Sequence, residues 1–375
     1  MRERNERLVL SLIRTHGALA KAQIARMTKL SAQTVSVIMR RLENDGLLVR
    51  GEPVRGKVGQ PSIPMSLAPE GALFLGLKIG RRSMDLVLTN FLGEVKDRVW
   101  RTHLFPTPDG TIAFAHDAVD QLVRPLDRAS RERIAGLGIA IPFFLWNWAQ
   151  WLGVPDETMA AWRTADIRSD IAARYDFPVI LENDATAACG AELVFGPPDA
   201  PRDFLYFFVG FFIGGGVVLN GALYTGPGNN AGALGPMPVP GPSGETRQLI
   251  DLASLSVLER ALQEAGQDTT FLWEGTDNWT VDEDILENWI DGAGRALAYA
   301  VAAAVSLMDF QAVTIDGGLP AGIRARIVER CRTALSEINL AGLNPPEIRE
   351  GSIGPDARAL GAASLPLSRA FLIEG

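Results

Sequence analysis

Residues 178–192 constrain the fold of this chain more than any other stretch. They open with an apolar run at 179–181, which is typical of a buried parallel strand. Glu182, Asn183 and Asp184 follow at once, and a run of small residues then predicts a helix. We therefore expect a carboxylate and an amide at the carboxyl end of a strand and the amino end of a helix, where open α/β sheets bind their ligands.

Asn183 and Asp184 admit two interpretations. Asp184 can accept a hydrogen bond from a hydroxyl group, or its proton in a kinase, and Asn183 can both donate and accept. Such a pair suits the binding of a polyol. Alternatively, the two residues simply cap the helix that follows, which is a common place for Asn and Asp. The tripeptide alone leaves both interpretations open.

The composition describes a soluble globular protein of two to three domains. The chain has 375 residues, of which 47% are hydrophobic and 21% charged. No apolar run reaches the roughly 18–20 residues of a membrane span, and the charged first residues do not resemble a signal peptide. Cys189 and Cys331 are expected to be core residues of a cytoplasmic protein, and His16, His103 and His116 show no metal-ligand spacing.

Charge is distributed unevenly along the chain. Residues 1–68 contain twelve Arg and Lys against five Asp and Glu, a surplus of seven positive charges. Because the whole chain carries −8, the remainder carries −15. Such asymmetry is a hint that the basic part binds nucleic acid.

Residues 1–70 have the pattern of a winged helix-turn-helix. An apolar stripe around Leu8–Ile13 and a short helix at 20–27 precede a third helix, which Ser31 caps. In that helix Val35, Ile38, Met39 and Leu42 fall at i, i+3, i+4 and i+7, which predicts one buried face. Segments 47–50 and 63–67 can then pair as strands around the basic loop 51–61.

A winged helix of this kind would place its third helix in the major groove of DNA. Gln33 can contact adenine, Thr34 and Ser36 can contact bases or phosphates, and Arg40 and Arg41 are expected on phosphates. The loop around Lys57 and Gln60 is narrow enough for a minor groove. The predicted DNA contacts are Ser31, Gln33, Thr34, Ser36, Arg40, Arg41, Lys57 and Gln60. The alternative is a protein-binding winged helix with a solvated basic face.

Residues 71–375 alternate between strands and helices in a way that predicts two α/β lobes. In the first, strands at 73–79, 84–91 and 94–104 precede a helix at 111–126, a strand at 134–141 and a helix at 166–175. In the second, strands at 204–209 and 215–219 precede a long loop at 224–244, helices at 245–266 and 281–310, a strand at 312–315 and a helix at 321–338. The predicted borders are 71–190 for the first lobe, closed by a C-terminal helix within 355–375, and 191–354 for the second.

Taken together, these motifs resemble the ROK family, which groups sugar-responsive repressors with sugar kinases. The resemblance rests on GKVGQPS in the wing, on LENDATAACGAE, and on Gly214–Gly216 followed by Leu223-Tyr224-Thr225-Gly226. It rests also on Asp316-Gly317-Gly318 and on the closing segment 359–363. The resemblance implies a fold of two actin-like, ribonuclease-H-like α/β lobes behind the winged helix, with Asn183 and Asp184 as sugar-binding residues.

The chain departs from the family at its phosphate motifs. Where family kinases have Asp-x-Gly-x-Thr, this chain has Lys78, Ile79, Gly80, Arg81 and Arg82. Phe211 and Phe212 occupy the place of the family's Thr-Gly, although a phosphate loop needs small residues that expose backbone N–H groups. We therefore expect no ATP or Mg²⁺ site and no kinase activity. In the contrary interpretation, Lys78, Arg81 and Arg82 bind phosphate directly.

The sugar and zinc region departs as well. The family's Gly-Glu-x-Gly-His aligns with residues 232–236, so that Ala233 and Pro236 replace the Glu and the His, and no Cys-rich loop follows. We therefore expect no zinc. Phe143 is expected to narrow the pocket, and Trp162 is either a core aromatic or a stacking platform. The predicted effector contacts are Asn183, Asp184, Trp162, Phe143, Glu192, Asn230 and Asp251, with Asn229 as a further candidate.

The sequence thus predicts a cytoplasmic transcriptional regulator, with repression favoured, that binds an operator in double-stranded DNA. A sugar or sugar derivative would be its effector, and a homodimer or a dimer of dimers would match a two-fold DNA site. Two rival hypotheses remain. One is an active sugar kinase with Asp184 as base and an accessory DNA module, and the other is a regulator with a vestigial cleft that responds to a partner protein.

Overall fold

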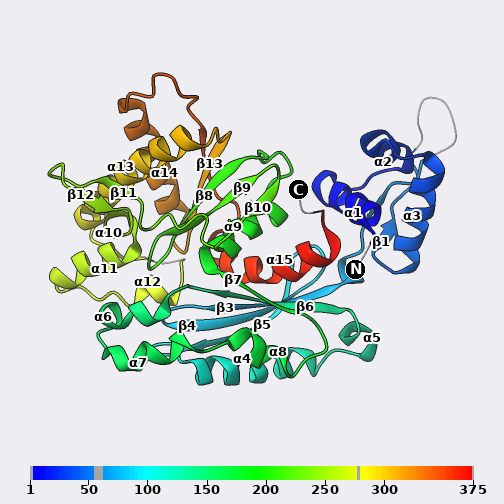
Figure 1. Ribbon diagram of the computed structural model, residues 1–375, viewed down its shortest axis with the longest axis horizontal. Helices are drawn as coiled ribbons and strands as arrows, with labels where there is room; N and C mark the ends of the chain where they lie inside the picture. The colour runs from blue at the N-terminus through cyan, green and yellow to red at the C-terminus, as the bar shows by residue number, and fades with distance from the viewer. Residues whose placement is uncertain (1–2, 55–61, 277–278, 374–375) are drawn as a thin grey trace. The chain divides into compact units, whose positions relative to one another are not determined.

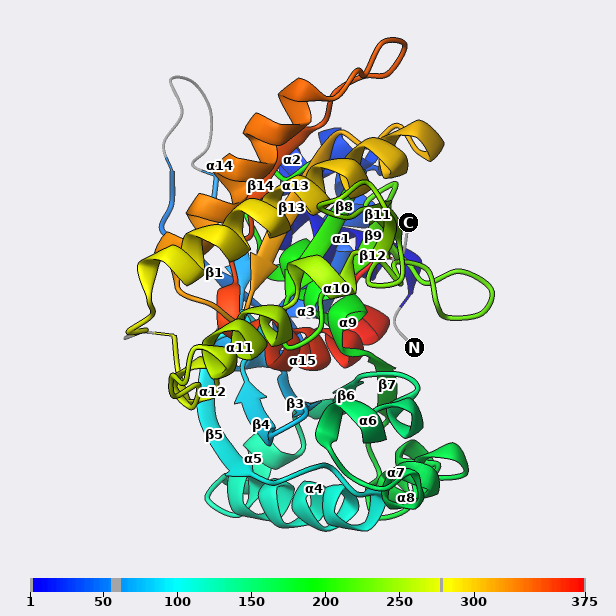
Figure 2. The same ribbon diagram turned by 90° about the vertical axis from the view of Figure 1, so that its left-hand side faces the viewer.

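The protein is described by a computed structural model that covers residues 3–54, 62–276 and 279–373. Contacts between residues divide the chain into two units, whose helices and strands are drawn in Figures 1 and 2. The first unit comprises the chain up to Glu182 together with the segment from Ala362 onwards. The second unit is the intervening segment, Asn183–Gly361.

The amino-terminal module of the first unit is a winged helix, as predicted. Val35, Ile38, Met39 and Leu42 are buried on the predicted face of the third helix, and Ser31 Oγ accepts the cap hydrogen bond from Thr34 N at 3.1 Å. The two wing strands pair antiparallel. The elements are α1 (Arg4–His16), α2 (Lys21–Thr28), α3 (Ala32–Asn44), β1 (Leu48–Arg50) and β2 (Met65–Leu67).

Helix α1 attaches this module to residues 368–373 by hydrogen bonds. Arg7 donates to the carbonyl oxygens of Leu372 and Ser368, and Ile373 N donates to Ser11 Oγ at 2.9 Å. Arg14 donates to the carbonyl oxygen of Phe91 and lies over its ring, at 5.4 Å from the centroid. Burial lowers the pKa of Arg14 to about 10. The winged helix is therefore packed onto its own unit through specific contacts.

A five-stranded sheet forms the body of the first unit, in the order β5-β4-β3-β6-β7. Strands β3, β4 and β5 are antiparallel, and β6 runs parallel to β3. Successive side chains of β6 point to opposite faces of the sheet. On one face, Leu137 and Ile139 pack with Phe114 of the long helix α4. On the other face, Gly136 and Gly138 adjoin the C-terminal helix α15. The strands are β3 (Leu73–Ile79), β4 (Ser83–Thr89), β5 (Val95–Thr102), β6 (Ile134–Ile141) and β7 (Val179–Asn183), and the two main helices are α4 (Pro108–Val123) and α15 (Ala357–Phe371).

Short helices complete the first unit, most of them between β6 and β7. They contribute Met159, Trp162 and Ile171 to the same core as α4. They are η1 (Pro69–Gly71), α5 (Arg128–Arg131), η2 (Leu145–Asn147), α6 (Ala149–Leu152), α7 (Asp156–Ala160), η3 (Ala161–Arg163) and α8 (Ile167–Ala172).

The second unit is built on another five-stranded sheet, in the order β10-β9-β8-β13-β14. Leu205 and Phe207 of β8 face a core with α13 and α14, while Tyr206 and Phe208 face the helix α9. Figure 1 shows α13 and α14 lying together beside this sheet. The strands are β8 (Phe204–Val209), β9 (Gly214–Leu219), β10 (Ala222–Tyr224), β13 (Ala312–Gly317) and β14 (Glu347–Glu350), and the three main helices are α9 (Asp184–Phe195), α13 (Glu283–Leu307) and α14 (Ala321–Glu337).

The remaining elements of the second unit are short, except for α11. They are β11 (Pro238–Pro240), β12 (Thr246–Gln248), α10 (Ile250–Ala253), α11 (Leu255–Glu264), α12 (Phe271–Glu274) and η4 (Gly354–Asp356).

The two sheets share one plan, three antiparallel strands followed by strands added in parallel, as the actin-like fold predicts. The border between the lobes differs from the predicted residue 190. Helix α9 belongs with the second unit, because Gly214 and Gly216 of β9 leave room for Ala185 and Cys189. The C-terminal helix belongs to the first unit only from Ala362 onwards.

One predicted helix was wrong at its start. Residues 245–266 do not form a single helix, because Thr246–Gln248 pairs as β12 with β11, and Ser254 separates α10 from α11. Strand β11 likewise lies inside the segment predicted as a loop at 224–244. Gly244 has a φ of 86°, a conformation that favours glycine and lets the chain turn between the two strands.

Helix α13 is long and apolar enough, by length and composition alone, to cross a membrane. In this fold 56% of its most apolar stretch is buried, and Leu297, Ala300 and Val301 lie in the core of the second unit. Burial inside the fold accounts for its apolar character. Cys189 and Cys331 are both buried free thiols, as predicted.

A Gly138→Ala substitution tests the contact between β6 and α15. A Cβ atom at Gly138 would lie 1.8 Å from the carbonyl oxygen of Ala362, so one backbone has to move. We expect a loss of about 2–3 kcal/mol or more, because overpacking against backbone cannot relax through a rotamer. Gly322→Ala in α14, where the added Cβ meets open space, is the matched control and should stabilise by up to about 1 kcal/mol. Equal unfolding curves for the two variants, followed by circular dichroism, would contradict this packing.

Candidate functional site

The exposed face of α3 carries residues that are predicted to contact DNA. Gln33 and Arg40 are exposed, while Thr34 and Ser36 are half-buried. The module is folded so that the opposite face of α3, with Val35 and Met39, is fully buried. The polar face is therefore the one that α3 can offer to a partner.

Several of these side chains have internal partners. Ser31 Oγ lies 2.8 Å from Thr34 Oγ1, and Lys21 Nζ of α2 donates to Ser36 Oγ at 3.1 Å. Arg41 pairs with the buried Glu6 of α1, at 3.0 Å from its Oε1. Arg41 thus helps to hold α1 against α3, and phosphate contacts of Arg40 and Arg41 stay predictions.

Two further predicted DNA contacts, Lys57 and Gln60, lie outside the described residues. The wing strands that lead towards them are present, with Val54 bridging to Ser62.

Asn183 caps α9, and this is one of the two roles considered for it. Its Oδ1 accepts from Ala185 N at 3.1 Å and from Thr186 N at 3.2 Å. Asp184, the first residue of the helix, pairs instead with Arg358 of α15, whose Nη1 lies 3.3 Å from its Oδ2. The guanidinium of Arg358 also lies over the ring of Phe208, at 5.0 Å from the centroid. A hydroxyl group that binds Asp184 would therefore share its carboxylate with the guanidinium group of Arg358.

The other predicted hydroxyl contacts are scattered through the second unit. Glu192 is buried, and its Oε2 accepts from both Ser352 N and Ser352 Oγ at 3.0 Å. Asp251 lies near Gln248 N, at 3.4 Å, and Asn230 is exposed, with its carbonyl oxygen 3.3 Å from Ala233 N. Glu192 and Asp251 thus serve local structure with their side chains and Asn230 with its backbone, and contact of the three with an effector stays a prediction.

Phe143 and Trp162, by contrast, line one cavity in the first unit. Its volume is about 210 Å³, and Pro142, Phe144 and Trp146 also line it. The indole N–H of Trp162 donates to the carbonyl oxygen of Pro106 at 2.9 Å, and its side chain is 7% exposed. Trp162 is thus a core aromatic that also lines a cavity, and stacking of a ligand on its ring stays a prediction.

The first phosphate-motif segment is a tight turn between β3 and β4. Gly80 N donates to the carbonyl oxygen of Ser83 at 2.9 Å, and Lys78 Nζ donates to Ser83 Oγ at 2.9 Å. His103 Nε2 lies 3.0 Å from the carbonyl oxygen of Gly80, and burial lowers the pKa of this His. The Gly80 N–H and the Lys78 ammonium are thus used within the turn, whereas the side chain of Arg82 is exposed.

The second phosphate-motif segment is held against the start of α11. The carbonyl oxygens of Gly210 and Phe211 accept from Leu255 N and Ser256 N, at 2.9 and 3.1 Å, and Ile213 N donates to Ser254 Oγ at 3.0 Å. A helix start offers unpaired N–H groups to a phosphate only where such carbonyls are absent. The rings of Phe211 and Phe212 lie 4.5 Å apart in the same segment. The arrangement favours a closed protein contact over an anion cradle.

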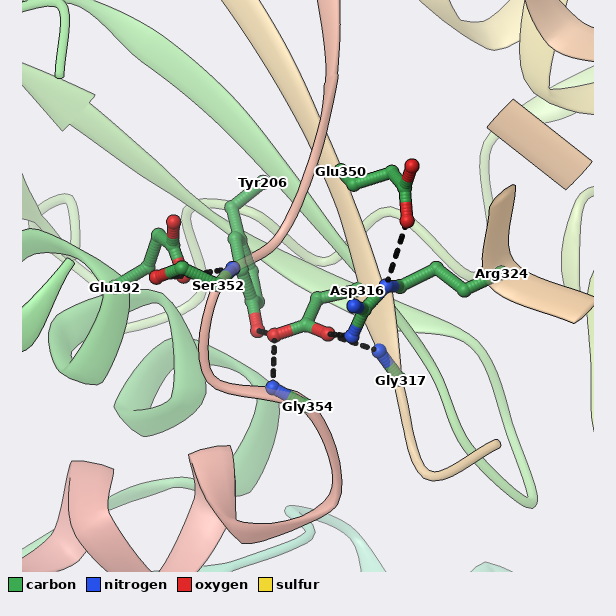
Figure 3. A network of polar contacts seen from close by, with 8 residues as sticks. All are labelled: Glu192, Tyr206, Asp316, Gly317, Arg324, Glu350, Ser352 and Gly354. Atoms are coloured by element: carbon green, nitrogen blue, oxygen red, sulfur yellow. Dashed lines mark hydrogen bonds and ion pairs between the residues drawn. The ribbon is translucent and has the colours of Figure 1, made fainter. Parts of the chain in front are cut away.

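Asp316, at the end of β13, is the centre of a network of polar contacts (Figure 3). Its carboxylate is 0% exposed and accepts four hydrogen bonds, all between 2.9 and 3.1 Å. The donors are Tyr206 Oη, Gly317 N, Arg324 Nη1 and Gly354 N. Burial raises the pKa of Tyr206 well above its usual value, and the adjacent Asp316 raises it further, so the phenol stays a donor.

Sequence reasoning missed three residues that contribute to these sites. Arg358 is separated from Asp184 by more than 170 positions, so no local pattern announces the pair. Phe144 and Trp146 could have been predicted as site residues, because the segment 142–148 has four aromatic residues and directly follows a predicted strand. That density of aromatic side chains was the available signal for the cavity.

Comparison with known proteins adds the family context. The sequence profile of the ROK family matches residues 74–369, and that of the MarR family matches residues 3–57. The uncharacterized protein y4fQ of Sinorhizobium fredii is 27% identical over 372 residues, which is 98% of this chain and 91% of that protein. A xylose repressor of Caldicellulosiruptor bescii is 22% identical over 290 residues, 75% of this chain and 72% of the repressor. The crystal structure of a ROK family transcriptional regulator, a homologue of the E. coli Mlc protein, superposes with a TM-score of 0.68 at 19% identity, covering 97% and 95% of the two chains.

The buried carboxyl of Glu192 predicts a pH-dependent contribution to stability. Burial raises the pKa of Glu192 in the folded protein, with Asp316 adding to the shift and the hydrogen bonds from Ser352 opposing it. A raised pKa means that the folded state holds the proton more tightly, so this contribution is present at low pH and is lost as pH rises through the folded value. Wild type should therefore lose stability relative to Glu192→Gln between pH 4 and pH 8 in a series of thermal melts. Glu264→Gln, an exposed position on α11, is the control. Parallel pH curves for wild type and Glu192→Gln would contradict the assignment.

Proposed function

Because the chain belongs to the ROK family and carries a MarR-type winged helix in front of its ROK domain, we propose that it is a DNA-binding transcriptional repressor that senses a sugar or sugar derivative. The observation that carries the proposal is the winged helix, whose α3 exposes Gln33 and Arg40. A third helix of this kind enters the major groove with its first residues on base edges. The basic surplus of residues 1–68 supplies the attraction to phosphate.

The ROK domain acts in this proposal as a sensor, not as a kinase. Phosphoryl transfer depends on positioning and on metal-assisted stabilisation of charge. In this chain Lys78 stands at the place of the family's acid, and the carbonyl oxygens of Gly210 and Phe211 hold the start of α11. These features favour a domain that needs no ATP, Mg²⁺ or zinc.

The attachment of α1 supports a direct route from sensor to DNA. Arg14 joins the winged helix to Phe91, between β4 and β5 of the first sheet, and Arg7 and Ser11 join it to the end of α15. A change in the ROK domain can therefore shift the winged helix without a flexible linker absorbing it. We propose a cytoplasmic homodimer, or a dimer of dimers, since a two-fold operator requires paired modules.

A thermal-shift panel of sugars and sugar phosphates, repeated with ATP and Mg²⁺, tests the sensing role. A sugar that binds only the folded state should raise the melting temperature. The same sugar should change the affinity of the protein for its operator. ATP-dependent phosphorylation of a hexose by the purified protein would overturn the proposal.

Arg40→Ala should weaken binding to DNA of any sequence. The substitution removes one phosphate contact, so the slope of log K against log salt should become shallower by about one unit. Fluorescence anisotropy at several salt concentrations measures this slope. Arg128→Ala, which removes the same charge from an exposed site on α5, is the matched control and should leave the slope unchanged. An unaltered slope for Arg40→Ala would remove the residue from the interface.

Asp184→Asn should abolish the response to the sugar while sparing DNA binding. The amide still accepts a hydrogen bond from Arg358, whereas the charged hydrogen bond to a sugar hydroxyl is lost, which is worth about a 10–100-fold change in affinity. Calorimetry with the sugar found in the panel, and anisotropy with operator DNA, separate the two effects. Asp199→Asn, an exposed position after α9, makes the same chemical change as a control. Wild-type sugar affinity in Asp184→Asn would refute the role of Asp184.

A further inference from the structure

The aromatic cavity of the first unit has the wrong chemistry for a sugar ring. Its volume is about 210 Å³, and among the described residues that line it none has a charged, hydroxyl or amide side chain. Pro142 has no N–H group, and the indole N–H of Trp162 is already donated to Pro106. The side chains that line the cavity offer the hydroxyl groups of a sugar ring no hydrogen-bond partner apart from backbone atoms, which disfavours a sugar ring at this place.

The size and the walls of the cavity suit a flat apolar ring instead. An apolar cavity of about 150 Å³ is known to stay dry and to accept benzene. This cavity is larger, and Phe143, Phe144, Trp146 and Trp162 provide aromatic walls. Aromatic rings prefer edge-to-face and offset contacts with one another, and Phe144 and Trp146 already adopt an edge-to-face contact with centroids 5.4 Å apart.

Phe144 gives an independent indication that the cavity is used. Its φ is 59°, in the left-handed region that bulky side chains rarely adopt, and its side chain is 50% exposed. Neither the backbone nor the core requires Phe at this position, because glycine would adopt the same conformation without strain. Strain held at an exposed aromatic that lines a cavity is typical of a functional site.

We propose that the effector carries an aromatic ring, and that this ring binds in the cavity formed by Phe143, Phe144, Trp146 and Trp162. The effector class is then an aryl glycoside or a related aromatic conjugate of a sugar, not a free sugar. This inference rests on the proposed sensing function of the ROK domain and specifies what that domain senses. An unfilled space in the core is the alternative, and it gives no reason for the strained conformation of Phe144.

Calorimetry on the full-length protein with three probes tests the inference. Phenol presents the ring alone, phenyl β-D-glucopyranoside presents the ring on a sugar, and methyl β-D-glucopyranoside presents the sugar alone. We expect both phenyl compounds to bind at least about tenfold more tightly than the methyl glycoside, since aromatic contacts add to burial of the ring. Equal affinity of the phenyl and methyl glycosides, or no binding of phenol, would overturn the inference.

Two variants locate the binding site. Ala165 lines the cavity, so Ala165→Phe should fill it and abolish phenol binding, whereas Ala161→Phe, at an exposed position close by, should not. Phe144→Gly should lower the affinity for phenol by about tenfold without lowering the melting temperature, because it removes a wall and relieves the backbone. Phenol binding that survives Ala165→Phe would place the ring elsewhere and refute the proposal.

Failure of the inference and failure of the proposed function give different results. Should the protein bind operator DNA and respond to a sugar in the thermal-shift panel while phenol does not bind, only the aromatic cavity is refuted. Should it fail to bind DNA, or respond neither to a sugar nor to an aryl glycoside, the regulatory function itself is refuted, whatever phenol does.

Discussion

The second unit depends on the buried carboxylate of Asp316. It receives hydrogen bonds from β8, from its own strand, from α14 and from the loop that leads into α15. Removing one partner from such a buried pair costs about 3–5 kcal/mol, because the other charge is left uncompensated. The bond from Gly354 N fixes the point at which α15 begins, three residues later. Arg358, in the first turn of that helix, is thereby set opposite Asp184.

Polar backbone groups in both phosphate-motif segments are bound to protein atoms. Gly80 N donates to the carbonyl oxygen of Ser83 in the β3–β4 turn, and Leu255 N and Ser256 N at the start of α11 donate to the carbonyl oxygens of Gly210 and Phe211. Aromatic side chains lie together in two places, at Phe211 and Phe212 and around the cavity after β6. Each group directly follows a strand, β8 in one unit and β6 in the other.

Hydrophobic periodicity predicted most of the fold, since it reports burial directly. Apolar runs placed β3 and β6 at their observed bounds, and the helical spacing in α3 placed the winged helix. The strands β12 and β14 were not predicted, because they are short and contain polar residues such as Arg, Gln and Glu. Their extended conformation depends on pairing with a neighbouring strand. Such pairing depends on distant residues and leaves no local pattern.

The candidate site was less predictable, because the partner of a polar side chain is set by the tertiary structure. Glu192 was proposed as a hydroxyl contact, yet it binds Ser352, which lies 160 residues further along the chain. Phe143 and Trp162 were chosen separately, and only the packing of the short helices after β6 brings them to one cavity. Residue type indicated which side chains matter, whereas their partners had to be read from the structure.

Helix α15 spans the division of the chain, with its first turn in the second unit and its remainder in the first, where its end meets α1. The last turn of α15 and the first helix are therefore neighbours in one folded unit. A bulky label on that turn would lie beside α1 and disturb the attachment of the winged helix.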